Sequence, residues 1–113
     1  MISVGTDIQD VKEFRKKPYS DNKIFYTKLF TVEEIRYCLY KKDPYQSFAC
    51  RFCAKEATIK AMGGVENVKS ISDIEIIMKE RKPYLFLNGV EMKNASVSMS
   101  HIKNMAIATV ILY

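Results

Sequence analysis

The sequence has no long apolar run, no export signal and few cysteines. No uninterrupted apolar stretch approaches the roughly 20 residues that a membrane helix needs. The first residues, 1–7, lack the basic segment and apolar run of a signal peptide, so we expect a cytoplasmic protein. The chain has three cysteines, Cys38, Cys50 and Cys53, and this odd number favours free thiols. Cys50 and Cys53 form a C-x-x-C, but inside a predicted helix, where buried, reduced side chains are expected instead of a redox or zinc site.

The length of the chain limits the number of its domains, and its charge indicates which kinds of partner it can bind. Its 113 residues fit one compact domain, residues 1–113, and such a short domain can depend on self-association for stability. The net charge is +5, with basic residues clustered at 12–17 and 41–42. This charge favours a nucleic acid, an acidic protein or a phosphate-rich metabolite as partner. A solvated basic surface without a partner is the alternative.

The predicted elements follow the order strand, helices, strands, which is typical of an α+β fold. Thr31 and Glu34 form a capping box that starts one helix, and Asp43-Pro44 ends it. Strand alternation is strict at residues 96–100. The remaining expected elements are a strand at 2–8, a helix or turn at 10–17, a long helix at 47–62, and strands at 71–78, 84–87, 96–101 and 106–112.

The long helix predicted at 47–62 is the best-defined element. It is rich in alanine and straight-chain residues, contains no proline, and is followed by Gly63-Gly64. We expect it to pack on an antiparallel sheet in a single α+β domain. Its expected buried face consists of Ala49, Phe52, Cys53, Ile59 and Met62, with Glu56 at the border of that face.

Three short segments contain side chains of chemical interest. Asp7 is expected at the end of the first strand. Glu56 and Lys60 lie one helical turn apart, and the chain's single histidine, His101, closes a strand after Ser100. Each has an ordinary explanation: a turn or N-cap aspartate, a surface ion pair, and a strand-end side chain. Together, two carboxylates and a lysine suit phosphoryl chemistry, because carboxylates hold Mg²⁺ and an ammonium stabilises charge on phosphate oxygens.

Three motifs occur in a fixed order along the chain. They are Gly5-Thr6-Asp7-Ile8, the helix segment FACRFCAKEATIKA at 48–61, and Val97-Ser98-Met99-Ser100-His101. They resemble the G-x-D-I, F-A-x-R-F-A-A-K-E-A-x-x-K-A and V-S-x-S-H motifs of the bacterial holo-acyl-carrier-protein synthase type of phosphopantetheinyl transferase. Segments 72–76 and 82–83 also match, so the resemblance covers nearly the whole chain. The K-E-A-x-x-K motif is a specific signal for this family, whereas the G-x-D-I motif alone is a weak one.

The resemblance implies an enzyme of fatty acid biosynthesis that transfers 4′-phosphopantetheine from coenzyme A to a serine of apo acyl carrier protein and releases 3′,5′-ADP. It implies that Asp7 and Glu56 hold Mg²⁺ against the pyrophosphate. Glu56, or a metal-bound water beside it, then helps to remove the serine proton, and Lys60 stabilises the departing phosphate. The residues implied around the nucleotide are Arg51, Lys42, Ser100, His101 and Gly63.

The resemblance also implies a homotrimer. In relatives of this size, three chains assemble and each active site lies between two of them. Ser100 and His101 are then expected to come from the neighbour of the chain that supplies Asp7 and Glu56.

Several positions depart from the family pattern. Gln9 replaces a third carboxylate of the larger relatives, and Ile102 replaces a small polar residue. Gly63-Gly64-Val65 is a shortened glycine-rich turn. Glu13 stands where relatives often carry an arginine that grips the acidic carrier, so we expect the neighbouring basic residues Arg15, Lys16 and Lys17 to steer carrier docking.

Two other functions are compatible with parts of the sequence. A small basic RNA-binding module would use Tyr37, Tyr40 and Tyr45 near Lys41 and Lys42 to stack on bases. No RNA-binding motif supports it, and packing between helices is the simpler role for these tyrosines. A transferase-like subunit without catalysis is suggested only by the departures from the motif. We therefore expect no nucleic-acid and no membrane partner.

Overall fold

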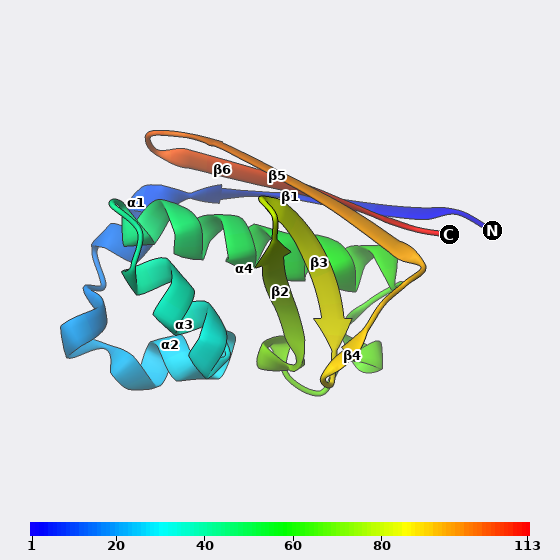
Figure 1. Ribbon diagram of the computed structural model, residues 1–113, viewed down its shortest axis with the longest axis horizontal. Helices are drawn as coiled ribbons and strands as arrows, with labels where there is room; N and C mark the ends of the chain where they lie inside the picture. Colours follow the sequence, from blue (N-terminus) through cyan, green and yellow to red (C-terminus); the bar gives the residue numbers. More distant parts are fainter.

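The computed structural model describes residues 1–113 and places one long helix at the centre of the fold (Figure 1). An antiparallel sheet of β1 (Ser3–Asp10), β6 (Met105–Leu112) and β5 (Ala95–Ile102), in that order, covers one side of helix α4 (Pro44–Ala61). β6 is the middle strand, and both chain termini lie at the same end of this sheet. The predicted α+β fold, with a long helix on an antiparallel sheet, is confirmed.

The other elements cover the remaining sides of α4. The short helices lie near its first half and a second antiparallel sheet packs against the rest (Figure 1). The helices are α1 (Val11–Arg15), α2 (Lys23–Leu29) and α3 (Val32–Leu39), with 3₁₀ turns at Tyr19–Asp21, Val65–Asn67 and Ile71–Asp73. The second sheet contains β2 (Ile74–Lys79), β3 (Lys82–Leu87) and β4 (Val90–Glu91). None of the helices combines the length and apolarity needed to cross a membrane.

Helix α4 begins earlier than predicted. Asp43 is its N-cap and accepts hydrogen bonds from the amides of Tyr45 and Gln46, while Pro44 occupies the first helical turn. The Asp43-Pro44 pair therefore starts the long helix as well as ending the segment before it. The prediction of one buried face is only partly right: Phe52 and Met62 are half-buried, while 11 of the 18 helix residues are buried on several sides.

The strand β1 lies unusually close to α4, and Gly5 permits this contact. A Cβ atom at Gly5 would lie 2.0 Å from the Ala57 carbonyl oxygen and 2.8 Å from the Ala61 amide nitrogen. Any larger side chain would push the strand away from the helix. Ser3 adds a hydrogen bond of 2.5 Å from its hydroxyl to the Ala61 carbonyl. The motif glycine thus fixes the position of Asp7 relative to the helix.

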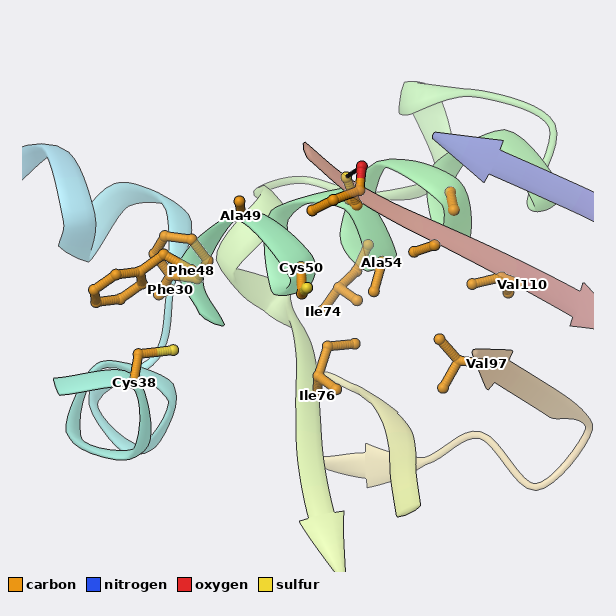
Figure 2. Packing of buried hydrophobic residues seen from close by; sticks show 14 of the residues in the cluster. Phe30, Cys38, Phe48, Ala49, Cys50, Ala54, Ile74, Ile76, Val97 and Val110 are labelled. Carbon is orange, nitrogen blue, oxygen red and sulfur yellow. Dashed lines mark hydrogen bonds between the residues drawn. The ribbon is translucent and has the colours of Figure 1, made fainter. Parts of the chain in front are cut away.

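An aromatic cluster holds the short helices against the start of α4. The ring of Phe48 lies 4.6 Å from that of Tyr26 and 5.0 Å from that of Phe30. Figure 2 shows Phe30 and Phe48 together, with Cys38 on α3 and the β2 residue Ile76 lining the same core. Helix α2, which supplies Tyr26, was not predicted, and neither was β4. The second predicted strand begins later than expected because residues 71–73 form a 3₁₀ turn.

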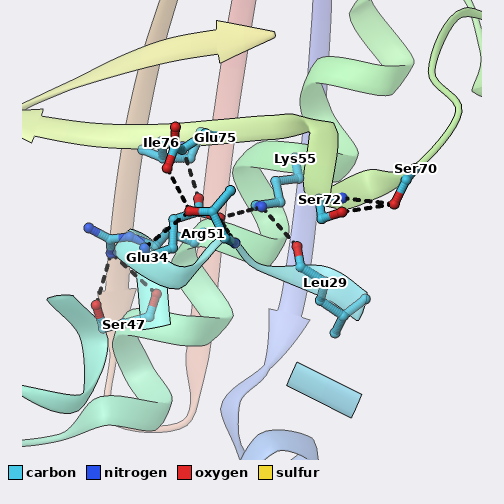
Figure 3. Close-up of polar contacts among 10 residues, drawn as sticks. Leu29, Glu34, Ser47, Arg51, Lys55, Ser70, Ser72, Glu75 and Ile76 are labelled. Carbon is cyan, nitrogen blue, oxygen red and sulfur yellow. Dashed lines mark hydrogen bonds and ion pairs between the residues drawn. The ribbon is translucent and has the colours of Figure 1, made fainter. Parts of the chain in front are cut away.

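A buried ion pair connects four segments of the fold (Figure 3). The Lys55 ammonium donates to Glu34 Oε1 at 2.5 Å and to the Leu29 carbonyl at 2.8 Å, and both charged side chains are almost wholly buried. Glu34 also accepts from the amides of Thr31, in the predicted capping box, and Ile76. Burial lowers the pKa of Lys55, and the Glu34 carboxylate opposes this effect. The pair therefore joins α4 to α3, to β2 and to the end of α2.

Candidate active site

Asp7 and Lys60 meet where β1 crosses α4. Asp7 lies inside β1, which continues to Asp10, so the expected position at the strand end is wrong. It shares the helix-facing side of the strand with Gly5, and its side chain is 18% exposed. The Lys60 ammonium lies 3.1 Å from Asp7 Oδ1 and donates to the Thr6 carbonyl at 2.9 Å. Lys60 therefore pairs with the strand and not with Glu56 on its own helix.

Glu56 is a second carboxylate beside this pair. It is half-buried and takes part in none of the chain's ion pairs. Burial raises the pKa of Glu56, the negative charge of Asp7 raises it further, and the Lys60 ammonium opposes the shift. Two partly buried carboxylates this close together are a favourable place for a cation.

The donors at this position fit Mg²⁺. Carboxylate oxygens are hard ligands, and Mg²⁺ is commonly held by one or two of them together with water and substrate phosphates. The structure contains no cluster of three or more acidic, cysteine or histidine side chains arranged for a metal. Asp7 and Glu56 would therefore be the protein ligands of the ion, and water and substrate phosphate would complete its coordination.

Cys53 is a buried thiol close to the two carboxylates. Its side chain is fully buried, and its thiol donates to the Ala106 carbonyl at 3.5 Å. Burial, followed by the negative charge of Asp7, raises the pKa of Cys53 to about 12, so the thiol stays protonated near neutral pH. All three cysteines are buried and free, as predicted.

A basic hollow contains three of the residues expected around a nucleotide. Lys42, Arg51 and His101 line a hollow of ≈ 380 Å³ between the start of α4 and the end of β5. The Arg51 guanidinium is buried, donates to Ser47 Oγ at 2.8 Å and stacks 4.2 Å from the ring centre of Tyr37. Its Nε has no hydrogen-bond partner. A buried cation with a free N–H is suited to an anionic ligand.

Two other expected residues lie outside the hollow. Ser100 alternates with His101 along β5, so its side chain faces the outer surface of the sheet. Gly63 lies beyond the end of α4 with φ of 93°, close in sequence to Lys60. Their roles toward coenzyme A remain predictions.

The hollow also contains residues that the sequence analysis did not assign to it. Lys41 lines it and lies 4.6 Å from the ring centre of Tyr37, one helical turn earlier. Tyr37 was expected only in the RNA-binding alternative, and Lys41 there and in the basic cluster at 41–42. The i,i+4 spacing of Tyr37 and Lys41, next to Lys42, is the sequence pattern that could have placed them in the hollow.

The carboxylates and the basic hollow lie on different faces of α4. Arg51 and Glu56 are five residues apart, which is about 140° around a helix with 3.6 residues per turn. Neither Asp7 nor Glu56 lines the hollow. A single chain therefore does not bring all the expected residues together.

An apolar groove adjoins the carboxylates. It is lined by Phe14, Phe25, Leu29 and Phe52, with the polar residues Gln9, Glu13 and Lys17. Phe52 precedes Glu56 by one helical turn, so the groove leads toward the carboxylates.

Arg15 is not a free charge, contrary to the docking prediction. Its guanidinium donates to Asp43 Oδ2 at 2.7 Å, to Asn104 Oδ1 at 2.5 Å and to the Lys103 carbonyl at 2.9 Å. These bonds tie α1 to the start of α4 and to the β5–β6 turn. Lys16 and Lys17 remain exposed.

Known proteins match the chain over nearly its full length. Residues 3–110 match the family described as the 4′-phosphopantetheinyl transferase superfamily. The chain is 38% identical over 117 residues to a holo-[acyl-carrier-protein] synthase of Chloroherpeton thalassium, covering 98% of this chain and 97% of the relative. Identity to the synthase of Chlamydia felis is 37% over 114 residues, covering 96% and 93%.

Solved structures give the same result. The Bacillus anthracis holo-(acyl-carrier-protein) synthase in complex with CoA (3′,5′-ADP) aligns with a TM-score of 0.80 at 30% identity, covering 97% of this chain and 94% of that one. The Helicobacter pylori synthase in complex with coenzyme A aligns with a TM-score of 0.83 at 28% identity, covering 97% and 99%.

The chain therefore belongs to the 4′-phosphopantetheinyl transferase superfamily. Within it, the relatives that match nearly end to end are holo-[acyl-carrier-protein] synthases. The predicted resemblance, and the prediction of an enzyme of this type, are confirmed.

Proposed function

We propose that the chain transfers 4′-phosphopantetheine from coenzyme A to a serine hydroxyl of an apo acyl carrier protein and releases 3′,5′-ADP. The observation that carries this proposal is the placement of Asp7 and Glu56 beside each other at the β1–α4 contact, with the Lys60 ammonium touching Asp7. Family membership and the coenzyme A complexes of solved relatives support the substrate.

The side chains suit the steps of this transfer. The serine oxygen bonds to the phosphorus on the pantetheine side, and the bond from that phosphorus to the bridging oxygen breaks, so the nucleotide leaves as 3′,5′-ADP. When bound by Asp7 and Glu56, Mg²⁺ supplies positive charge to the pyrophosphate oxygens. Glu56 accepts the serine proton directly or through a water. Lys60 stabilises the negative charge on the leaving phosphate.

We further propose that the basic hollow of one chain binds the nucleotide whose pyrophosphate lies at the carboxylates of a neighbour. Lys42, Arg51 and His101 suit a phosphate group, and the free Nε of Arg51 can donate to it. This arrangement agrees with the separation of the two groups around α4. His101 would then act, as expected, on the site of the adjacent chain.

The outer face of the first sheet supports a homotrimer. It carries the exposed apolar pairs Val4–Ile111 and Ile8–Ile107, which lie opposite each other on β1 and β6. Val4 and Ile8 are 63% and 61% exposed, so nothing in the chain itself covers them. Burying this face between copies removes apolar surface from water. A closed trimer would also bring each hollow to a neighbouring chain.

Ile107→Lys is expected to convert the assembly to monomers and to remove most of the transfer activity. A charge in the middle of the outer face cannot be buried between chains without a partner. Sedimentation velocity measures the assembly. Val90→Lys is the matched control, because Val90 is 69% exposed on the other sheet and should leave both properties unchanged. A fully active monomer, in either the native chain or Ile107→Lys, would contradict the shared site.

Reversing the charges of Lys16 and Lys17 is expected to raise the KM for the carrier several-fold at low salt. Acyl carrier proteins are acidic, and we propose that one lies over the apolar groove, where the Lys17 ammonium stands 4.2 Å from the ring centre of Phe25. Exposed charges are screened over about 8–10 Å near physiological ionic strength, so the difference should shrink with added salt.

The KM for coenzyme A should stay constant in the same double variant. The exposed Lys93, in the segment before β5, provides a control as Lys93→Glu. An unchanged carrier KM at low salt would place the docking surface elsewhere.

The release of 3′,5′-ADP tests the proposed reaction. With coenzyme A, Mg²⁺ and an apo carrier, we expect one nucleotide released for each carrier molecule. A carrier whose acceptor serine is replaced by alanine should release none. Equal nucleotide release from both carriers would show hydrolysis instead of transfer.

A further inference from the structure

The Lys60 ammonium forms an ion pair with Asp7, one of the two carboxylates that would bind a metal. We propose that Lys60 is a placeholder cation, which neutralises Asp7 in the metal-free protein and leaves that carboxylate when a divalent cation binds. Its release would deliver the ammonium to the departing phosphate only after the metal has arrived. This inference rests on the metal site of the proposed function.

The contacts of Lys60 place its charge at the metal position. Its ammonium is held by two bonds, at 3.1 Å to Asp7 Oδ1 and at 2.9 Å to the Thr6 carbonyl. Asp7 is only 18% exposed, so its carboxylate has limited access to water and benefits from a counter-charge. Lys60 supplies that charge while Glu56 stays outside the ion pairs.

A divalent cation and this ammonium would repel each other at Asp7. Their repulsion grows with the product of their charges and with the inverse of their separation. Two cations that contact the same carboxylate group would be within a few ångströms of each other. Binding of a metal to Asp7 therefore favours release of the ammonium.

Lys60 has the freedom to make this movement. Its side chain is 55% exposed and lies in the last turn of α4. Lys55, earlier on the same helix, is a useful contrast, because its ammonium is wholly buried and fixed by Glu34 and Leu29. An exposed ion pair holds a long, flexible side chain only weakly.

A permanent structural tie between β1 and α4 is the competing explanation for the contact. The strand and helix are already held by the close packing of Gly5 and by the hydrogen bond from Ser3 to the Ala61 carbonyl. Because these contacts remain in a variant without the ammonium, Lys60→Met should lower the midpoint of thermal unfolding only slightly, as expected for the loss of an exposed ion pair. The placeholder role predicts an additional change in metal affinity, which a structural tie does not.

Binding of Mn²⁺ to the free protein, followed by electron paramagnetic resonance of unbound Mn²⁺, tests the inference. Lys60→Met should bind Mn²⁺ about two- to fivefold more tightly than the native chain, the range expected from the strength of an exposed ion pair. Its kcat for transfer should fall at the same time. The control Lys12→Met removes an exposed charge that forms no ion pair in the chain and should leave Mn²⁺ affinity unchanged.

The variant Asp7→Asn separates the possible outcomes. Asp7→Asn should weaken Mn²⁺ binding, and adding Lys60→Met to it should give no gain, because the shared carboxylate is gone. If Lys60→Met binds Mn²⁺ no more tightly than the native chain, while Asp7→Asn still weakens binding, the placeholder role is overturned and the metal site stands. If Asp7→Asn leaves Mn²⁺ affinity unchanged, both the inference and the proposed metal site are overturned.

Discussion

Glu56→Gln is expected to lower the transfer rate by at least about a hundredfold in the presence of saturating Mg²⁺. The amide is a poorer ligand than a carboxylate for a hard cation and cannot accept the serine proton. The measurement is kcat for carrier modification. Glu33→Gln is the control, since Glu33 is exposed on α3 and pairs with Arg36. Near-normal turnover by Glu56→Gln would remove Glu56 from the site.

The same variant should be slightly more stable than the native chain when no metal is present. The folded-state pKa of Glu56 is raised, so its charged form is disfavoured by folding. The destabilising effect of this charge is absent below the ordinary pKa and grows as pH rises through the raised value. The midpoint of thermal unfolding of Glu56→Gln should therefore exceed the native one at neutral pH and approach it in acid. The opposite order at neutral pH would contradict the environment described for Glu56.

Lys55→Met is expected to lower the free energy of unfolding by about 3–5 kcal/mol. The substitution leaves the Glu34 carboxylate buried without its counter-charge and removes the donor to the Leu29 carbonyl. Urea denaturation followed by circular dichroism measures the change. A loss below about 0.5 kcal/mol, the size usual for surface positions, would show that the pair does not join the elements as described.

A double variant distinguishes a broken ion pair from a poorly packed side chain. Glu34→Gln combined with Lys55→Met removes both charges, so it should cost less than the sum of the two single changes. Additive losses would mean that the charges do not interact in the folded protein.

The fold could be predicted where a local signal was strong. The alanine-rich helix, the capping box at Thr31 and Glu34, and the alternating strands near the C-terminus all occur as expected. Helix α2 could not be found in this way, because it has no side-chain cap and is held mainly by tertiary contacts of Tyr26. Packing on several sides likewise widened the buried surface of α4 beyond one stripe.

The site residues could be selected from the sequence, but their contacts could not. Lys60 pairs with Asp7 instead of Glu56 because Gly5 lets β1 lie against the helix, which no local pattern reveals. Arg15 looked like a free docking charge until the structure showed it bound to Asp43. Both cases depend on how distant segments align, and spacing along one element does not contain that information.

The most direct test of the proposed reaction is the mass of the carrier protein itself. After incubation with coenzyme A and Mg²⁺, intact-mass spectrometry should show that the carrier has gained one phosphopantetheine group, located by fragmentation on a serine. The gain should be absent with a metal chelator and absent with Asp7→Asn or Glu56→Gln in place of the native chain. A carrier of unchanged mass with the native chain, or full modification by the two carboxylate variants, would contradict the proposal.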